Sequence, residues 1–473
     1  MAKLDISDIN NFTSGLICRG AVSKSRIPTD AVYEAINVNF DTIGCVKTRL
    51  GQTRLGNQIQ ASTNILGLHY FSNSNSTYTQ TLAVNGTVTY YLSAGTWTSK
   101  RTGLTTGLKS RFTDFLDFVW MVNGTDATAI WSGNPSDSFV TTGNASGAPI
   151  GKFIDNFRSR VWIAGNSTYP DRLYYSSVPS AVATPIVTWD TDIATGDWID
   201  ISPQDGENIT ALKRAKDALL VFKENHIYRV YSINETEPDP KINVGTKSQE
   251  SVVEAKDGVY FHHWSGIYRY ADGQIQEISV PVSDYIKAIA DYTNICGWAD
   301  SDHVNMSIGT ITVDGKSIPN CVLRYTISSQ VWTVCSYPTK PLCSSRYVST
   351  TEYRIVGDNN GNVLEVDTGY DDNGTSIQYR LNTRPFTFDG LFSTRKDISQ
   401  LFISSDNMTN ATLGYKADGE LLKTQTRIDT LFKPLSVDVK GTEIEFILSG
   451  VTSGTQSTLN GIEILAIDSE LIK

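Results

Sequence analysis

Histidine is the residue type here that could most directly carry metal or acid–base chemistry, and the five histidines are at 69, 226, 262, 263 and 303. No two of them have the i, i+4 spacing of a helical zinc site, and no Cys-x-x-Cys pair accompanies them. His262 and His263 are neighbours in a predicted strand, where adjacent side chains point to opposite faces. We therefore expect structural roles for the histidines and no metal site.

Catalytic motifs are also missing from the sequence. It contains no Gly-x-Ser-x-Gly elbow, phosphate-binding loop or dinucleotide fingerprint, and no full Ser-x-Asp-x-Gly-x-x-Trp turn of the sialidase kind. The acidic stretch 358–365 lacks the register of a calcium loop and is interpreted as a hairpin turn. We expect no catalytic residue, no cofactor and no enzymatic activity. Glycan hydrolysis stays open as an alternative, because a carboxylate pair can come from distant strands.

The cysteines are interpreted as reduced, buried thiols that act as small hydrophobic side chains. The alternative is a disulfide among the last four of the six, which are Cys18, Cys45, Cys296, Cys321, Cys335 and Cys343.

Turn dipeptides are the strongest structural signal in the chain. Asn-Gly and Asp-Gly supply the positive φ angles of two-residue hairpin turns, so each one predicts a strand reversal. They begin at 85, 123, 205, 257, 272, 314, 360, 373, 389, 418 and 460. The runs between them are short and rich in β-branched and aromatic residues, which predicts strands of about six residues.

The predicted fold is all-β, with a β-propeller over residues 59–370 and a β-sandwich-like domain over 371–473. A loose repeat of roughly 40 to 50 residues favours about seven blades, with six or eight also possible. A pair of β-sandwiches is the alternative to the propeller. One helix is predicted over 283–292, capped by Ser283.

The first 58 residues are predicted to form an N-terminal arm and interface segment. Within this arm, Pro28 is expected to start a short helix that runs through Ala35.

The overall charge limits the classes of partner. The formal net charge is -10, which disfavours a groove that grips nucleic acid or a polybasic membrane anchor. The sequence has no secretory leader and no long apolar run, so we expect no membrane insertion. An acidic lining would still let DNA slide past without adhesion.

Segments 12–51, 206–230 and 266–289 resemble the tail-hub or nozzle proteins of short-tailed bacteriophages. In the first segment the resemblance includes Gly15, Pro28, Asn37 and the turn 41–44. It implies a structural virion protein that is made in the host cytoplasm and forms a ring of six copies in the tail. Such a ring lies below the portal and its adaptor, and it closes and conducts the DNA exit channel without reading the DNA sequence.

The resemblance also makes the N-terminal arm an expected subunit interface, with apolar anchors at Phe12, Leu16, Ile27 and Val32. Their alternative role is to close the propeller or pad its base. Two other functions stay open. One is a carbohydrate-binding or carbohydrate-active propeller, suggested by Tyr and Trp side chains that could stack on sugars. The other is a free-standing scaffold for protein partners.

Overall fold

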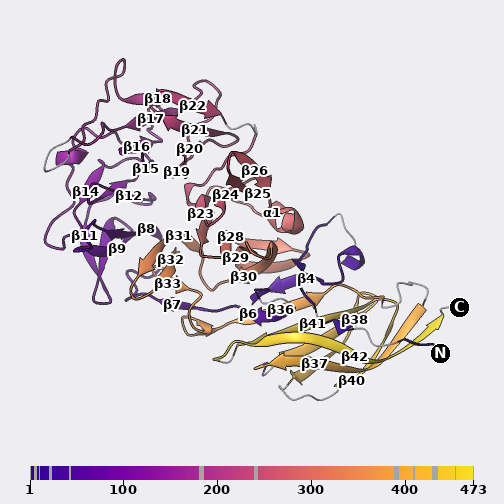
Figure 1. The fold of residues 1–473 in the computed structure, drawn as a ribbon. Coiled ribbons are helices and arrows are strands. Elements are labelled where there is room, and N and C mark those ends of the chain that lie inside the picture. The colour runs from indigo at the N-terminus through magenta and orange to yellow at the C-terminus, as the bar shows by residue number, and fades with distance from the viewer. Residues whose placement is uncertain are drawn as a thin grey trace.

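The chain folds into two bodies made almost entirely of strands, a β-propeller and a β-sandwich (Figure 1). The computed structural model describes residues 2–4, 8–9, 11–20, 24–41, 44–180, 186–238, 243–387, 394–408, 411–428, 435–452 and 454–471. The predicted all-β class is therefore confirmed.

The propeller has seven blades, each an antiparallel meander of three or four strands. Blades 1 to 3 are β8–β11 (Ile65–Ser72, Thr79–Asn85, Val88–Ser93, Thr96–Arg101), β12–β14 (Arg111–Phe115, Phe118–Val122, Ala129–Trp131) and β15–β18 (Phe153–Phe157, Arg160–Ala164, Arg172–Tyr175, Trp198–Asp200). Blades 4 and 5 are β19–β22 (Ala211–Arg214, Leu219–Phe222, Ile227–Ser232, Glu235–Pro238) and β23–β26 (Val253–Ala255, Gly258–His263, Gly266–Ala271, Gln274–Glu277). Blade 6 consists of β27–β30 (Cys296–Ala299, His303–Val313, Lys316–Thr326, Val331–Ser336). Blade 7 contains β31–β33 (Pro341–Val348, Glu352–Asp358, Val363–Val366) and one further strand from the N-terminal segment.

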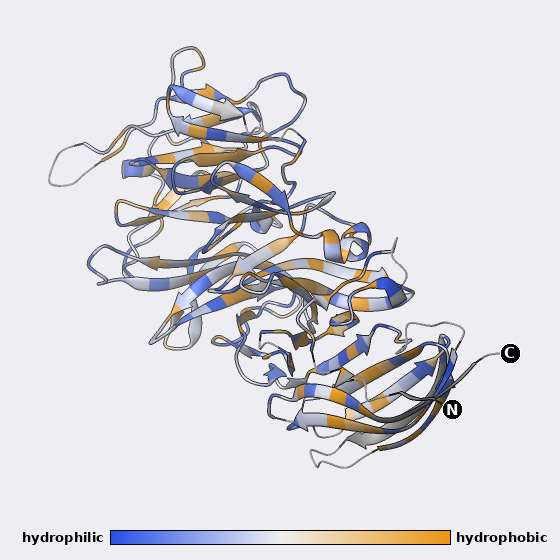
Figure 2. Cartoon of the chain, turned by 45° about the vertical axis from the view of Figure 1, so that its right-hand side comes forward, coloured by the Kyte–Doolittle hydropathy of each residue, from blue (hydrophilic) through white to orange (hydrophobic). Residues whose placement is uncertain are grey.

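The blades close into a circle because each one packs its apolar face against the next. Separate buried clusters join blade 1 to 2, 2 to 3, 3 to 4, 4 to 5, 6 to 7 and 7 to 1, and the largest cluster joins blade 5 to 6. Hydrophobic and hydrophilic residues alternate along many of these strands (Figure 2). Alternation buries one face of a strand, whereas an inner strand such as β20 is apolar and buried at every position and so packs on both faces.

The N-terminal segment completes the last blade. Strand β7 (Gln52–Arg54) pairs antiparallel with β33, with Arg54 opposite Leu364. Blade 7 therefore combines strands from the two ends of the propeller sequence, which ties the first blade to the last. The short strands β34 (Asp371–Asp372) and β35 (Thr375–Ser376) extend the same sheet beyond β7.

The sandwich has two sheets that enclose part of the largest buried cluster. One sheet holds β40, β37, β42, β6 and β5, with β1 and β2 paired to β42. The bounds of these strands are β40 (Leu435–Gly441), β37 (Thr394–Asp406), β42 (Thr458–Leu471), β6 (Val46–Thr48), β5 (Val38–Asn39), β1 (Ala2–Leu4) and β2 (Asp8–Ile9). The facing strands are β4 (Ala31–Ile36), β36 (Gln378–Thr383), β41 (Ile444–Val451), β38 (Ala411–Ala417) and β39 (Glu420–Ile428), with β3 (Gly15–Leu16) beside β4.

The two bodies share one continuous sheet. Strand β30 of blade 6 pairs with β4, and β4 pairs on its other side with β36 of the sandwich. The result is a ten-stranded sheet that runs from the propeller into the sandwich, as Figure 1 shows. Because one sheet and one apolar cluster span both bodies, they are rigidly coupled rather than joined by a linker.

The described strands of residues 1–58 are divided between the two bodies and are not set apart as an arm. Strands β1, β2, β5 and β6 belong to the sandwich, β4 bridges the two bodies, and β7 belongs to the propeller. The short helix predicted through Ala35 is wrong, because Ala31–Ile36 is strand β4. Strands β30 and β36 lie on its two sides, and their backbone hydrogen bonds outweigh the weak local preference of a proline-led turn.

The predicted helix over 283–292 is shorter than expected. Helix α1 spans Ser283–Lys287 and follows a 3-10 turn at Val280–Val282. Ser283 makes no capping hydrogen bond, but the apolar side chains Tyr285, Ile286 and Ile289 are buried as the pattern indicates. The other 3-10 turns are Lys24–Arg26, Gly143–Ala145 and Gln249–Ser251.

The cysteine prediction is confirmed. All six thiols are free, and five of them are buried, with Cys45 half-buried. Burial raises the pKa of Cys18 and that of Cys296 to about 12, with smaller contributions from neighbouring carboxylates, so neither thiol is reactive at neutral pH.

Candidate interface and binding sites

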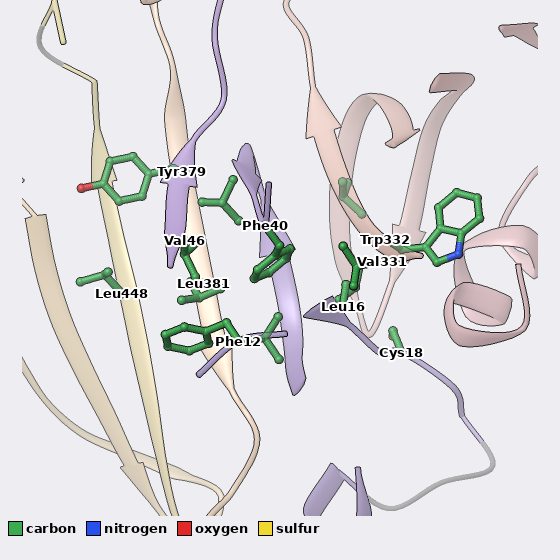
Figure 3. Close-up of a cluster of buried hydrophobic side chains, with 14 of the residues drawn as sticks. Phe12, Leu16, Cys18, Phe40, Val46, Val331, Trp332, Tyr379, Leu381 and Leu448 are labelled. Atoms are coloured by element: carbon green, nitrogen blue, oxygen red, sulfur yellow. The ribbon is translucent and has the colours of Figure 1, made fainter. Parts of the chain in front are cut away.

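The four predicted interface anchors lie inside the chain itself. Phe12, Leu16, Ile27 and Val32 are exposed by only 2%, 1%, 4% and 0%. In Figure 3, Leu16 lies close to Val331 on the propeller side of the junction, whereas Phe12 lies on the sandwich side. A side chain with no exposed surface offers nothing to a neighbouring subunit, so the interface assignment is replaced by the alternative, an internal packing role.

A buried arginine joins the two bodies at this junction. The guanidinium of Arg49 is 0% exposed and forms a two-pronged ion pair with Asp372, at 2.9 and 2.6 Å. It also donates to Asn37 Oδ1 and to the carbonyl of Ser336 in blade 6, and it stacks on the ring of Tyr337. Sequence reasoning missed this residue because its carboxylate partner is 323 positions away.

A buried glutamate anchors strand β4 from the other side. One carboxylate oxygen of Glu34 accepts hydrogen bonds from Lys316 Nζ at 2.6 Å, Arg380 Nε at 3.0 Å and Asn382 Nδ2 at 2.6 Å. Lys316 belongs to blade 6, whereas Arg380 and Asn382 belong to the sandwich. The same carboxylate therefore links the two bodies through charge as well as through the shared sheet.

A histidine ties the chain segment after β5 to blade 6. His303 places Nε2 3.0 Å from Asp41 and Nδ1 3.0 Å from Asp300. Burial alone would lower the pKa of His303, but the hydrogen bonds to Asp300 and Asp41 outweigh it and raise the pKa to about 9. The imidazole is therefore charged at neutral pH and donates from both ring nitrogens.

We expect the stability provided by this contact to depend on pH. Because the folded-state pKa lies above 6.5, the stabilisation is complete below pH 6.5 and disappears as the pH rises through about 9. The free energy of unfolding lost in His303→Gln should therefore be larger at about pH 6 than at about pH 10, by up to ~3 kcal/mol. Urea unfolding of both proteins at the two pH values measures this difference, and an equal loss at both would contradict it.

An ion-pair cluster crosses one end of the propeller axis. Glu250 precedes the innermost strand of blade 5, and its carboxylate contacts Lys109 Nζ at 3.0 Å and Arg111 at 2.7 Å, at the start of blade 2. Burial would raise the pKa of Glu250, but the charges of Arg111 and Lys109 outweigh it and hold the pKa below its ordinary value. These ion pairs therefore link blades 5 and 2, which are not neighbours in the circle of blades.

A long loop between β17 and β18 exposes apolar side chains. Ile193, Val178 and Ile186 are exposed by 65%, 53% and 51%. The loop is nevertheless anchored to the 3-10 turn Gly143–Ala145 between blades 2 and 3, since Asn144 accepts hydrogen bonds from the Val187 N–H and the Trp189 indole. Its described parts, 176–180 and 186–197, therefore present apolar groups from a fixed base.

A tryptophan stands out on the face that carries the turns between the second and third strands of the blades. Trp264 occupies the turn between β24 and β25 and is 56% exposed. Its indole N–H donates to Asn225 Oδ1 at 3.3 Å, from the equivalent turn of blade 4. Nothing in the local sequence showed that this tryptophan faces water.

The opposite face carries a cavity of about 830 Å³ between blades 4 and 5. Its walls include Glu254 and Asp257, which pair with Lys213 and Arg269. Lys256, also in the wall, pairs with Asp302. These charges are already balanced within the protein, so the cavity does not by itself indicate a charged ligand.

Among the residues described, no three His, Cys, Asp or Glu side chains are grouped so that they could hold a metal ion. No helix in the described ranges is both long and apolar enough to cross a membrane.

Comparison with known proteins finds likeness in fold alone. No known family and no curated protein matches the chain. Among solved structures, YCF48 from Cyanidioschyzon merolae is 10% identical, with 67% of this chain and 98% of that chain covered and a TM-score of 0.40. The extracellular domain of BT4673 from B. thetaiotaomicron is 12% identical over 74% and 43%, with a TM-score of 0.38. Sqt1 from Saccharomyces cerevisiae is 7% identical over 67% and 100%, with a TM-score of 0.39. Its own strand order makes this chain a seven-bladed β-propeller fused to a β-sandwich.

Proposed function

We propose that this chain is a structural protein of the tail of a short-tailed bacteriophage, in which copies of it assemble into a ring around the DNA exit channel. The ring would have six copies and would contact the portal, its adaptor and other tail proteins. The observation that carries the proposal is the rigid fusion of the two bodies through one ten-stranded sheet. A component that holds pressurised DNA needs this kind of stiffness more than it needs a reactive site.

Buried charge at the junction supports a mechanical role. Glu34 connects Lys316 of blade 6 to Arg380 of the sandwich. Arg49 connects the Ser336 carbonyl of blade 6 to Asn37, which lies between β4 and β5. Bending the sandwich away from the propeller would break these contacts and leave the charges without partners in a dry interior. Such a loss costs several kcal/mol, so the junction resists deformation.

We propose a DNA path that lies outside the propeller itself. Glu250 and its two cations link blade 5 to blade 2 across the propeller. In the proposed assembly, DNA passes through the lumen of the ring. A chain with a formal net charge of -10 would line that lumen with little adhesion to a polyanion.

The ring interface is best assigned to the exposed loop between β17 and β18. Its apolar side chains are accessible, unlike the buried residues Phe12 and Leu16. Since the loop is anchored through Val187 and Trp189, a partner can bind it without first ordering it. The surface defined by Val178, Ile186 and Ile193 thus supplies the apolar centre that a subunit contact requires.

Mutating this surface tests the assembly. Ile193→Asp would place a charge at the centre of the contact, and we expect it to weaken ring formation by at least about tenfold while the subunit stays folded. Mass photometry and negative-stain electron microscopy of the purified protein measure the ring population, and mass spectrometry of purified particles tests for the chain in virions.

Val451→Asp is the matched control, because Val451 is 41% exposed but lies in the sandwich. It should leave the ring population unchanged if the loop makes the contact. A wild-type chain that stays monomeric at micromolar concentration and is absent from particles would refute the proposed function.

A further inference from the structure

The indole of Trp264 is more than half exposed, and no other large hydrophobic side chain in the described strands and turns of blades 4 and 5 is exposed. A protein interface of ordinary size buries about 800 Å² on each side around an apolar core, and a single ring does not supply such a core. The geometry favours a small ligand that covers one aromatic face.

Hydrogen bonds fix the position of this indole before any ligand binds. Asn225 Oδ1 accepts from Trp264 Nε1 and lies 3.3 Å from His263 Nε2. Asn225 in turn donates from Nδ2 and from its backbone N–H to the two carboxylate oxygens of Glu207, at 2.6 and 3.0 Å. The tryptophan is therefore held through two turns and the linker that enters blade 4.

The same network continues away from Asn225 through hydroxyl groups. His263 Nδ1 lies 2.7 Å from Ser265 Oγ, and Ser265 Oγ lies 2.8 Å from the hydroxyl of Tyr268. The rings of His263 and Trp264 are 5.1 Å apart. An apolar platform thus lies next to an amide and two hydroxyls, which together both donate and accept hydrogen bonds, while the buried imidazole of His263 joins these groups from below.

A pyranose ring has the complementary chemistry, because its axial C–H groups form an apolar face and its hydroxyls form a polar rim. The face packs on an aromatic ring through dispersion and weak C–H contacts, while the rim exchanges hydrogen bonds with planar polar side chains. We propose that Trp264, Asn225 and Tyr268 form a binding site for one hexopyranose unit of an oligosaccharide, while His263, which is only 3% exposed, holds Asn225 and Ser265 in position beneath it. This proposal goes beyond the ring function and does not depend on it.

The site is arranged for binding rather than for cleavage of the sugar. Glu207 is the carboxylate in the network, and Asn225 and His226 donate hydrogen bonds to it. Burial would raise the pKa of Glu207, but the hydrogen bonds from Asn225 and His226 outweigh it and hold the pKa below its ordinary value. A glycosidase general acid needs the opposite shift.

Saturation-transfer NMR on the full chain tests the proposal, with maltotriose, cellotriose and tri-N-acetylchitotriose as probes at up to about 10 mM. At least one trisaccharide should receive saturation at its ring C–H protons and should change tryptophan fluorescence in a saturable way. Trp264→Ala should weaken its binding by about tenfold or more, whereas Trp264→Phe should retain most of it. Asn225→Ala should weaken trisaccharide binding less than Trp264→Ala does.

Tyr370→Ala is the matched control, because Tyr370 is an aromatic residue that is 43% exposed elsewhere on the chain, and its loss should leave binding unchanged. An unaltered thermal midpoint in Trp264→Ala shows that the fold is intact. Failure of all three trisaccharides to bind, or equal binding by Trp264→Ala, would overturn the saccharide site. Neither result changes the ring population in mass photometry, so the two proposals fail separately.

Discussion

Replacing Arg49 with methionine is expected to lower the free energy of unfolding by about 3–5 kcal/mol, the largest effect of any single charge change considered. The methionine would leave Asp372, which is only 5% exposed in its side chain, as a buried charge without its partner. It would also remove the hydrogen bonds to Asn37 and Ser336 and the stacking on Tyr337. Urea unfolding followed by tryptophan fluorescence measures the loss.

The location of the weakened contacts can be checked as well. Amide hydrogen exchange should rise first in β7 and β33, because Arg49 is next to the segment that closes blade 7. The double variant Arg49→Met with Asp372→Asn should recover part of the loss, since it removes the unpaired carboxylate.

Lys256→Met provides the control for a surface pair, because Lys256 and Asp302 have side chains that are 49% and 31% exposed. It should change the free energy of unfolding by no more than about 1 kcal/mol. If Arg49→Met cost no more than this control, the junction would not depend on the buried pair.

Leu16→Ala is expected to lower the free energy of unfolding by about 2–5 kcal/mol, the range for deleting a fully buried leucine. Leu16 is 1% exposed and packs in the cluster shared by blade 6 and the sandwich (Figure 3). Because the contact is made within one chain, the loss should be the same at all protein concentrations. Equilibrium unfolding at several concentrations measures it.

Val280→Ala is the comparison for this prediction, since Val280 is 40% exposed and leaves little cavity when truncated. Its effect should stay within about 0.5 kcal/mol. If the loss of unfolding free energy in Leu16→Ala disappeared at low protein concentration, Leu16 would instead lie between subunits.

Local turn chemistry was the most predictive part of the sequence. Asp272-Gly273, Asp314-Gly315 and Asp418-Gly419 all have positive φ at both positions and join consecutive antiparallel strands. The predicted reversal at 389 lies outside the described residues. The pattern was wrong at Asn460-Gly461, which lies inside β42, because pairing with β37 holds that segment extended.

Long-range pairing accounts for most of what the sequence did not reveal. The junction depends on Ile36 meeting Val334 and on Arg49 meeting Asp372, and neither pair shares a local signal. An apolar anchor looks the same in a sequence whether it faces a partner subunit or its own core. Phe12 and Leu16 were therefore correctly identified as anchors and wrongly placed at a surface.

By itself, the sequence determined the strands, most of their turns and the all-β class, because alternation and positive-φ turns are properties of a few adjacent residues. The tertiary structure alone decided that the N-terminal strands would be divided between the two bodies, and that Trp264 would be left in water while Arg49 became buried. Burial and strand pairing depend on which distant segments of the chain come into contact. Strands with the same local pattern can pair in many different arrangements, so the local sequence does not specify which one forms.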